Sequence, residues 1–251
     1  MIKRDKVLKR DVPKHIAFIL DGNGRWARRR GRSRAHGHER GAMNIRSIAI
    51  EAKELGVEVM SVYAFSTENW KRPQKEVDML MDLPKRYEKE YDHDNEAFKK
   101  KYLADDVRII FTGRRDRLDN YNLGLMKRIE DATKENEGFT LNICVDYGSK
   151  DELVNAAKSM AKKVANKSLN VNAIDEETMA SHLYTHPLPP VDLLIRTSGE
   201  QRLSNFLLWQ NAYAEFYFTK THWPAFSQKE LRKAIVDFQK RNRKYGGLKK
   251  G

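Results

Sequence analysis

The chain contains one cysteine, Cys144, among 251 residues, and it has no apolar run of about 18 residues. A single cysteine excludes an internal disulfide, and the neighbours of Cys144 lack the spacing of metal ligands. The absence of a long apolar run predicts no membrane-spanning helix, and the basic segment 1–12 lacks the apolar stretch of a secretory signal. These absences fit a protein of the reducing cytoplasm.

Positive charge is in excess. The chain carries 48 Lys and Arg residues against 35 Asp and Glu residues, a formal net charge of +13. Such a surface attracts polyanions, whether nucleic acids, anionic lipids or phosphorylated small molecules. Net charge does not distinguish among these classes, so the positions of the arginines must do so.

Apolar segments rich in β-branched residues alternate with segments of helical periodicity along the whole chain. This alternation predicts a single α/β domain over residues 1–251, with a mostly parallel six-stranded sheet flanked by helices. Residues 1–14 are expected to form a flexible N-terminal extension. The predicted strands are residues 15–20, 57–65, 107–112, 139–145, 191–196 and 214–219. The predicted helices are residues 41–55, 74–102 with a kink at Pro84, 118–136, 150–165, 175–184 and 227–244. Ligands of such sheets bind beyond the carboxyl ends of the strands.

The first predicted strand is followed by the sequence DGNGR at residues 21–25. Two glycines allow a sharp turn, and the N–H groups at the start of the next helix can hold phosphate oxygens. Arg25 adds a bidentate donor, whereas Asp21 would repel a phosphate unless a cation lay between them, which indicates Mg²⁺. The alternative is a tight turn with an aspartate cap. Arg34 and His38 further along favour the phosphate site.

Two other interpretations of this region are weaker. Gly22, Gly24 and Ala27 loosely match a dinucleotide-binding fingerprint, but that motif expects an acidic residue after the second strand, where the chain has YAFS. The arginines of residues 28–34 could steer an anion toward the strand ends. A nucleic-acid site would need exposed aromatic residues among them, and only Trp26 and Trp70 are near.

Polar side chains also follow the second and fifth predicted strands. The segment STENWKRP at residues 66–73 carries hydroxyls, an amide and an arginine, a composition equally typical of helix capping. The fifth strand ends in Arg196, followed by Arg202 and Ser204, which predicts a second anion cradle. The alternative is an ion pair of Arg196 with Glu200. Glu215 opens the sixth strand and is either a second acid near the metal or an ordinary strand-edge residue.

The long predicted helix carries Val77, Leu80, Met81, Leu83 and Tyr87 along one side. Most of these side chains are expected to pack in the core. The helix is longer than a covering helix usually is, so it could also form one wall of an elongated apolar cavity beside the phosphate site.

The chain resembles the cis-prenyltransferases, specifically the bacterial isoprenyl transferases of the undecaprenyl diphosphate synthase type. The resemblance covers residues 15–247 and is carried by five motifs in order. These motifs are HIAFILDGNGRW, RAHGH, YAFSTENWKRP, DLLIRTSGE and RLSNFLLWQ.

This resemblance implies a transferase that adds isopentenyl diphosphate sequentially to an allylic diphosphate such as farnesyl diphosphate, with Mg²⁺ and with cis geometry. The implied product is a long-chain polyprenyl diphosphate, the undecaprenyl carrier lipid of cell-wall synthesis. It also implies a homodimer, an apolar tunnel beside the long helix, transient contact with a membrane surface and no nucleic-acid partner. The alternatives are a non-catalytic prenyltransferase-like subunit, which would be expected to lack Asp21, or a basic nucleic-acid-binding protein.

The resemblance also assigns roles to single residues. Asp21 would hold Mg²⁺ with help from Glu215. The allylic diphosphate would be bound by Gly22, Asn23, Gly24, Arg25, Arg34 and His38, with Trp26 at the border. A loop closing over the substrates would consist of Ser66, Thr67, Glu68, Asn69, Trp70 and Arg72, and isopentenyl diphosphate would meet Arg196, Arg202, Leu203 and Ser204. Asn69 matches a position proposed as proton acceptor; since an amide is a poor base, the alternative is that it positions a water or a diphosphate oxygen.

Some positions depart from the family pattern. Asp146 and Ser149 stand where an asparagine and a glycine are usual, and Lys244 stands where an arginine of the partner subunit would reach the active site. Lysine lacks the planar fork of arginine. The resemblance does not fix the length of the product or the preferred primer.

Overall fold

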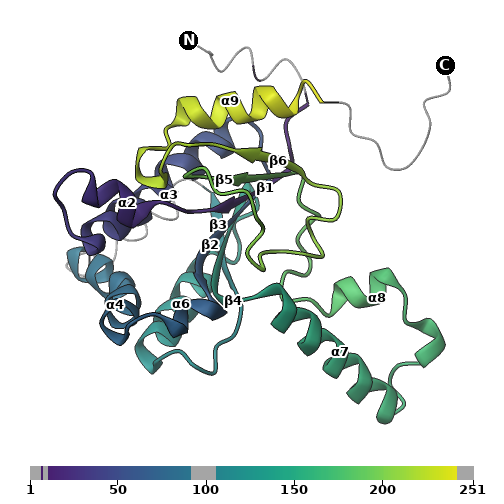
Figure 1. The fold of residues 1–251 in the computed structure, drawn as a ribbon. Coiled ribbons are helices and arrows are strands. Elements are labelled where there is room, and N and C mark those ends of the chain that lie inside the picture. The colour runs from purple at the N-terminus through teal and green to yellow at the C-terminus, as the bar shows by residue number, and fades with distance from the viewer. Residues whose placement is uncertain (1–6, 8–10, 92–105, 242–251) are drawn as a thin grey trace, which may run out of the picture.

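Six parallel strands form one sheet in the computed structural model, which describes residue 7 and residues 11–91 and 106–241 (Figure 1). The strands are β1 (His15–Ile19), β2 (Val59–Ser66), β3 (Val107–Thr112), β4 (Phe139–Tyr147), β5 (Leu193–Arg196) and β6 (Glu215–Phe218). Their order is β3-β4-β2-β1-β5-β6. The order therefore reverses at β1, which lies between β2 and β5, and the carboxyl ends of these three strands meet at one rim, the usual ligand position in such sheets. The predicted six-stranded α/β fold is confirmed.

The helices follow the predicted pattern with shifted ends. They are α2 (Asn23–Arg28), α3 (Arg34–Glu54), α4 (Gln74–Tyr91), α6 (Asn120–Thr133), α7 (Ser149–Ala165), α8 (Glu176–Ser181) and α9 (Gln228–Phe238), with 3-10 turns η1 (Thr67–Lys71), η2 (Val171–Ala173) and η3 (Trp223–Ala225). Helix α3 begins at Arg34 instead of residue 41, because the Ser33 side chain accepts a hydrogen bond from the His36 N–H and caps the helix. Helix α9 ends at Phe238, earlier than predicted, and residues 92–102 and 242–244 of the predicted helices lie outside the described residues.

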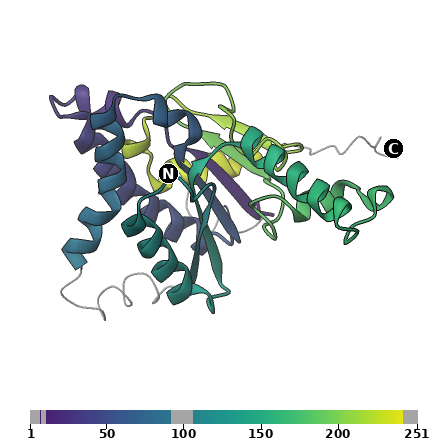
Figure 2. The same cartoon turned by 90° about the horizontal axis from the view of Figure 1, so that it is seen from below.

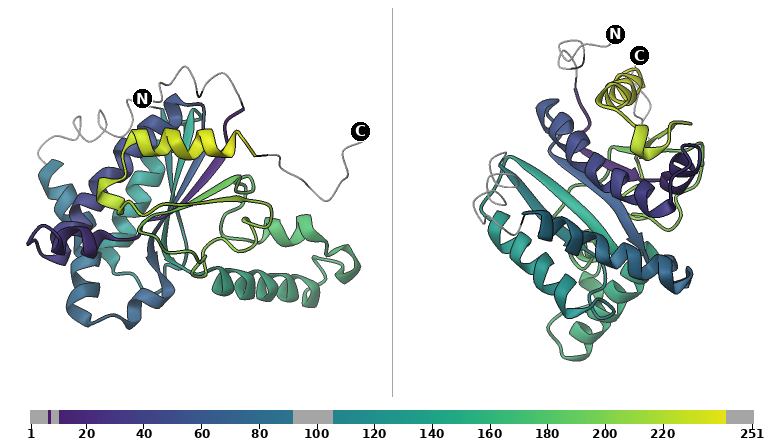
Figure 3. Two further views of the ribbon diagram at one scale, coloured as in Figure 1. Left: turned by 45° about the horizontal axis from the view of Figure 1, so that its top comes forward. Right: turned by 90° about the vertical axis from the view of Figure 1, so that its left-hand side faces the viewer.

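Side chains on the two faces of the sheet form two apolar clusters. Ile16 and Phe18 of β1 belong to the larger cluster, with buried residues of α3 and α9. Ala17 and Ile19 point to the other face and pack with Phe206. This alternation is the period of two that a strand imposes on its side chains. Figure 3 shows the sheet edge-on between its covering elements.

Two further parts of the described chain lie beside the sheet and its covering helices. Helices α7 and α8 extend away from the sheet as an arm (Figures 1 and 2). The described part of the expected N-terminal extension is packed: Val7 is fully buried, and its carbonyl accepts a hydrogen bond from Gln239 at 2.9 Å. Within the described residues, no helix is both long and apolar enough to cross a membrane.

Candidate active site

The turn after β1 is built around Asp21 and Gly22. Gly22 has a φ of 95° and caps the amino end of α2. A Cβ atom at this position would lie 2.6 Å from the Ser198 Oγ, so both the backbone angle and the space require glycine. The Gly22 N–H donates to the Asp21 Oδ1 at 2.8 Å. The chain thus forms the predicted tight turn at the central rim of the sheet.

Two arginines from distant parts of the chain converge on Asp21. Arg196, at the end of β5, donates to the Asp21 Oδ2 at 3.0 Å, and Arg25 of α2 donates to the Oδ1 at 3.3 Å. Partial burial raises the pKa of Asp21, but the hydrogen bond and charge of Arg196 outweigh it, so the pKa lies below its usual value. Asp21 is therefore an ionised carboxylate between two guanidinium groups.

Arg196, the centre of the second predicted cradle, has a side chain that is 3% exposed. Its Nη1 donates to the Ser204 Oγ at 2.7 Å and to the backbone carbonyl of Arg202. The alternative pairing of Arg196 with Glu200 is wrong, because Arg196 pairs with Asp21 and Glu200 instead pairs with Arg202 at 2.6 Å and with Arg25 at 2.9 Å. Leu203 is half-buried against the smaller apolar cluster.

Helix α3 brings Arg34 and His38 to the same region. Arg34 packs against Gly24, where a Cβ would lie 3.4 Å from its side chain. The Nη2 of Arg34 and the Nη1 of Arg72 each lie 2.9 Å from the Oε1 of Glu76 in α4. Burial, together with the charge of Arg72, lowers the pKa of His38 to about 4. His38 is thus neutral, and its buried Nε2 has no hydrogen-bond partner among the described residues.

The turn after β2 is capped by its own side chains, and several of its residues also face a cavity. Ser66 and Asn69 form a capping box, in which the Asn69 Oδ1 accepts from the Ser66 N–H at 3.2 Å. Ser66, Glu68, Asn69 and Arg72 also line the main cavity described below. Thr67 lies beside Gly148, where an added Cβ would approach its Oγ1 to 2.5 Å.

Trp26 and Glu215, which were also predicted to belong to the site, make their contacts elsewhere in the described chain. Trp26 lies under Arg30, whose guanidinium is 4.3 Å from the ring centroid, and its ring stacks on His36. Glu215 is level with Leu193 at the start of β6, whereas Arg196 is level with Phe218, so Glu215 lies roughly 10 Å along the strand from the rim. The Glu215 carboxylate pairs with Arg241 at 2.7 Å. Within one chain Glu215 therefore lies away from Asp21, because the first residue of a parallel strand is at the opposite end from the rim, and its part in holding a metal stays a prediction.

Several residues of this region were not predicted from the sequence. Asp146 is fully buried and accepts from the Trp70 Nε1 at 2.8 Å and from the Arg117 Nε at 2.9 Å. The departure of Asp146 from the family pattern was the available signal, since a carboxylate there needs a cationic partner. Asn205 also lines the main cavity and contacts Glu68 at 2.8 Å.

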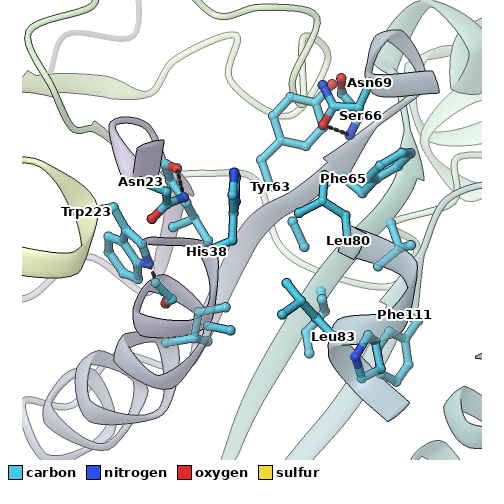
Figure 4. Close-up of a pocket in the computed structure, with 18 of the residues that line it drawn as sticks. Asn23, His38, Tyr63, Phe65, Ser66, Asn69, Leu80, Leu83, Phe111 and Trp223 are labelled. Carbon is cyan, nitrogen blue, oxygen red and sulfur yellow. Dashed lines mark hydrogen bonds between the residues drawn. The ribbon is translucent and has the colours of Figure 1, made fainter. Parts of the chain in front are cut away.

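One cavity of about 1190 Å³ begins at this rim and continues between the sheet and helices α3, α4 and α6 (Figure 4). We call it the main cavity. Its polar end is lined by Asp21, Asn23, His38, Ser66, Glu68, Asn69, Arg72, Arg196, Arg202 and Ser204. Beyond them the lining is largely apolar and includes Phe65, Leu80, Leu83, Val107, Ile109, Phe111 and Leu141.

The main cavity is long. Ser66 at its polar end is level with Tyr147 on β4, and Val107 at its apolar end is level with Phe139. These eight positions of strand correspond to roughly 25 Å. Helix α4 forms part of the wall through Leu80, as the sequence predicted. The shape suits an amphiphile with an anionic head and an extended apolar chain.

The donor set can be tested for its fit to Mg²⁺. Among the described residues, no three His, Cys, Asp or Glu side chains are arranged to hold a metal. Mg²⁺ is commonly held by one or two carboxylates together with substrate phosphates, so a full protein cage is not required. Asp21 supplies one ionised carboxylate between the guanidinium groups of Arg25 and Arg196. The residues present fit a metal that arrives with a diphosphate.

Comparisons with known proteins show one family that the chain resembles over most of its length. A family model described as "Putative undecaprenyl diphosphate synthase" matches residues 19–246. The isoprenyl transferase of Bacillus anthracis is 45% identical over 97% of this chain and 92% of that protein. That of Bacillus subtilis is 43% identical over 98% of this chain and 92% of that protein. A crystal structure of lavandulyl diphosphate synthase from Lavandula x intermedia, in complex with dimethylallyl diphosphate, has a TM-score of 0.88 and 34% identity, and the match covers 94% of this chain and 99% of that one.

Proposed function

The chain belongs to the undecaprenyl diphosphate synthase family and is a cis-prenyltransferase, and we propose that it extends an allylic diphosphate by sequential addition of isopentenyl diphosphate. The proposed primer is farnesyl diphosphate, and the proposed product is a long-chain polyprenyl diphosphate of the undecaprenyl type, the carrier lipid of cell-wall synthesis. The observation that carries this proposal is one cavity with Asp21, His38 and Arg196 at its polar end and a largely apolar lining beyond, with Arg25 in contact with Asp21.

The two cradles divide the two substrates between them. The turn N–H groups at residues 22–24 and Arg25 bind the allylic diphosphate, with Arg34 and His38 alongside. Arg196, Arg202 and Ser204 bind isopentenyl diphosphate. Because Asp21 contacts Arg25 and Arg196 at once, the two diphosphates are brought side by side at the sheet rim. The growing hydrocarbon enters the apolar part of the main cavity, which serves as the product tunnel.

The residues of the chain favour departure of the allylic diphosphate. Its C–O bond breaks, the double bond of isopentenyl diphosphate attacks the resulting carbocation, and loss of a proton leaves a cis double bond. Arg25 stabilises the negative charge that develops on the leaving group. Asn69 positions the water or diphosphate oxygen that receives the proton, since its own amide is a poor base.

Asp21 is the residue that would hold Mg²⁺ on the diphosphates. When bound, the metal would supply positive charge that stabilises the departing diphosphate. The carboxylate offers ligand oxygens because its pKa is low and it stays ionised at neutral pH. If the cation took the place of Arg25 or Arg196 at the Asp21 carboxylate, that guanidinium would be free to bind phosphate.

The assembly and location of the protein are also part of the proposal. Strand β6 is an edge of the sheet, and the large apolar side chains of Trp209, Tyr213 and Phe216 are exposed on or near it. An edge strand with exposed apolar residues favours association, here with a second copy of the chain. We place the homodimer in the cytoplasm, with transient contact to the membrane surface when the lipid product is released. Lys244, expected to reach the partner's site, lies outside the described residues.

Incorporation of labelled isopentenyl diphosphate into solvent-extractable lipid tests the activity. Incorporation should require an allylic primer and Mg²⁺ together, and it should stop when a chelator removes the metal. Sizing of the product then gives the chain length. No incorporation with any primer, combined with salt-dependent binding of an arbitrary oligonucleotide, would instead identify a basic nucleic-acid-binding protein.

A further inference from the structure

Asn205 lies in a short segment with an unusual backbone. Its φ is 63°, and those of Ser204 and Leu207 are 50° and 48°. Residues other than glycine rarely adopt this left-handed conformation, and asparagine tolerates it best. The segment is held by its surroundings: the ring of Phe206 is buried and stacks on Tyr63 with 4.3 Å between centroids. Such conformations persist where neighbouring structure fixes them, often beside functional sites.

The side chain of Asn205 joins two other parts of the chain. Its Oδ1 accepts from the Lys150 N–H at the start of α7 at 2.9 Å, and its Nδ2 donates to the Glu68 Oε1 in η1 at 2.8 Å. The backbone carbonyl accepts from the Ser149 N–H at 2.8 Å. The amide orientation follows from chemistry, because an N–H can only donate and an ionised carboxylate can only accept.

Gly148 shows how closely these parts approach one another. A Cβ atom there would lie 2.5 Å from the Thr67 Oγ1 and 2.8 Å from the Asn205 Nδ2. The turn after β2, the start of α7 and the segment after Arg202 therefore meet around one residue that has no side chain. Asn205 supplies the polar link among them, and the residue just before it, Ser204, accepts from Arg196.

We propose that Asn205 is a positioning residue that fixes the η1 turn, through Glu68, against the Arg196–Ser204 cradle. This inference rests on the proposed function for its kinetic part only. The turn carries Asn69, and the cradle carries the proposed isopentenyl diphosphate contacts. A link between them sets where the bound diphosphate lies relative to the residue that guides proton loss. Neither the family motifs nor charge alone assigns Asn205 this part.

The test is an exchange of donor and acceptor. In Asn205→Asp, two carboxylates face each other at the distance of the present hydrogen bond, while the bond from Lys150 is retained. We expect amide hydrogen exchange in the ligand-free protein to accelerate about tenfold over residues 64–72. In the double variant Asn205→Asp/Glu68→Gln the glutamine donates to the aspartate, and exchange should return to near the wild-type rate. The single variant Glu68→Gln retains the bond and should exchange as the wild type does.

Two further variants keep the result decisive. Asn170→Asp makes the same chemical change on the surface, where the side-chain oxygen accepts from the Asn172 N–H at 2.9 Å, and should leave exchange at residues 64–72 unchanged. If Asn205→Asp fails to fold, Glu68→Ala removes the link from an exposed side chain and should give the same acceleration. Unchanged exchange in Glu68→Ala, or a double variant no slower in exchange than Asn205→Asp, would overturn the proposal.

Kinetics provide a second measurement, and a residue with a purely structural role would not change it in the same pattern. In Asn205→Asp we expect kcat/KM for isopentenyl diphosphate to fall about tenfold, and the Glu68→Gln change should recover it when added to Asn205→Asp. The recovery is judged against Glu68→Gln alone, as in a double-mutant cycle. If the wild-type protein shows no prenyl transfer, the proposed function fails, while the exchange result still decides whether Asn205 links the turn to the cradle.

Discussion

Arg196 and Asp21, which are 175 positions apart in the sequence, form an ion pair with 3.0 Å between the Nη2 and the Oδ2. The pair joins the carboxyl ends of two neighbouring strands, β5 and β1, on the side of the sheet where ligands bind. In the ligand-free protein each group neutralises the other. In the proposed function, a cation would replace Arg196 at Asp21 and a diphosphate would replace Asp21 at Arg196, so that neither charge is left unpaired.

The carboxylate of Asp21 should be indispensable for turnover. Asp21→Asn keeps the shape of the side chain but removes its charge and weakens its hold on a divalent cation. We expect turnover to fall by about 100-fold or more with the fold intact by circular dichroism. Asp131→Asn on α6 is the matched control, because Asp131 is exposed and pairs only with Lys127 among the described residues. Turnover of Asp21→Asn within twofold of wild type would contradict the metal role.

Arg196 should act mainly on isopentenyl diphosphate. Arg196→Lys retains the charge but loses the fork that holds Asp21 and Ser204 together. We expect the KM for isopentenyl diphosphate to rise about tenfold or more, with a smaller change in the KM for the allylic substrate. Arg108→Lys, at an exposed position on β3, should change neither constant. Equal rises in both constants for Arg196→Lys would argue against a separate isopentenyl diphosphate cradle.

The far end of the main cavity should limit the product. Val107 lines the cavity about 25 Å from Ser66 and is half-buried, so Val107→Phe adds bulk at that end of the cavity. We expect shorter polyprenyl products by chromatography, with little change in the rate of the first addition. Val154→Phe makes the same change on the exposed side of α7, outside the cavity, and should leave product length unaltered. Identical products from both variants would show that the hydrocarbon does not enter this cavity.

Stability should depend on the neutral state of His15. Its Nδ1 lies 2.7 Å from the Pro189 carbonyl and its Nε2 lies 2.8 Å from the Ser61 hydroxyl, and burial lowers its pKa from 6.5 to about 4. Because the folded pKa lies below the unfolded one, the unfolded state binds the proton first as pH falls. The contribution is complete above pH 6.5 and is lost as pH falls toward 4, by roughly 3 kcal/mol in total.

Urea denaturation at several pH values measures this dependence. The free energy of unfolding of the wild type should fall more steeply between pH 6.5 and 4 than that of His15→Gln, and the difference between the two proteins removes the titration of carboxylates common to both. Parallel pH profiles would mean that His15 does not titrate in this range on unfolding.

The strands could be predicted from the sequence because buried parallel strands are continuous apolar runs, as in residues 15–19 and 193–196. Helix ends were less predictable where a helix faces the site. The first turns of α3 carry Arg34 and His38 instead of an apolar stripe, so periodicity alone placed the start too late. Glu215 was predicted to open the sixth strand, and in a parallel sheet that end of the strand lies away from the rim that carries Asp21.

The sequence could place Asp21 and Arg196 near each other because they lie just after and at the carboxyl ends of strands, and the carboxyl ends of parallel strands share one rim. Residues whose contacts are far away in the sequence could not be predicted. Asp146 meets Arg117 and Trp70 from separate loops, and Asn205 bridges Lys150 and Glu68. No local pattern in the sequence encodes these pairings, because they depend on how segments that are far apart in the sequence meet in space.

The central claim is that a single rim holds two diphosphates beside Asp21 while one cavity takes the hydrocarbon. A crystal structure with an unreactive thiolo analogue of farnesyl diphosphate, isopentenyl diphosphate and Mg²⁺ tests it most directly. We predict one diphosphate at Arg25, the other at Arg196, and the farnesyl chain between α3 and α4. A diphosphate bound away from Asp21, or a farnesyl chain outside the main cavity, would contradict the account.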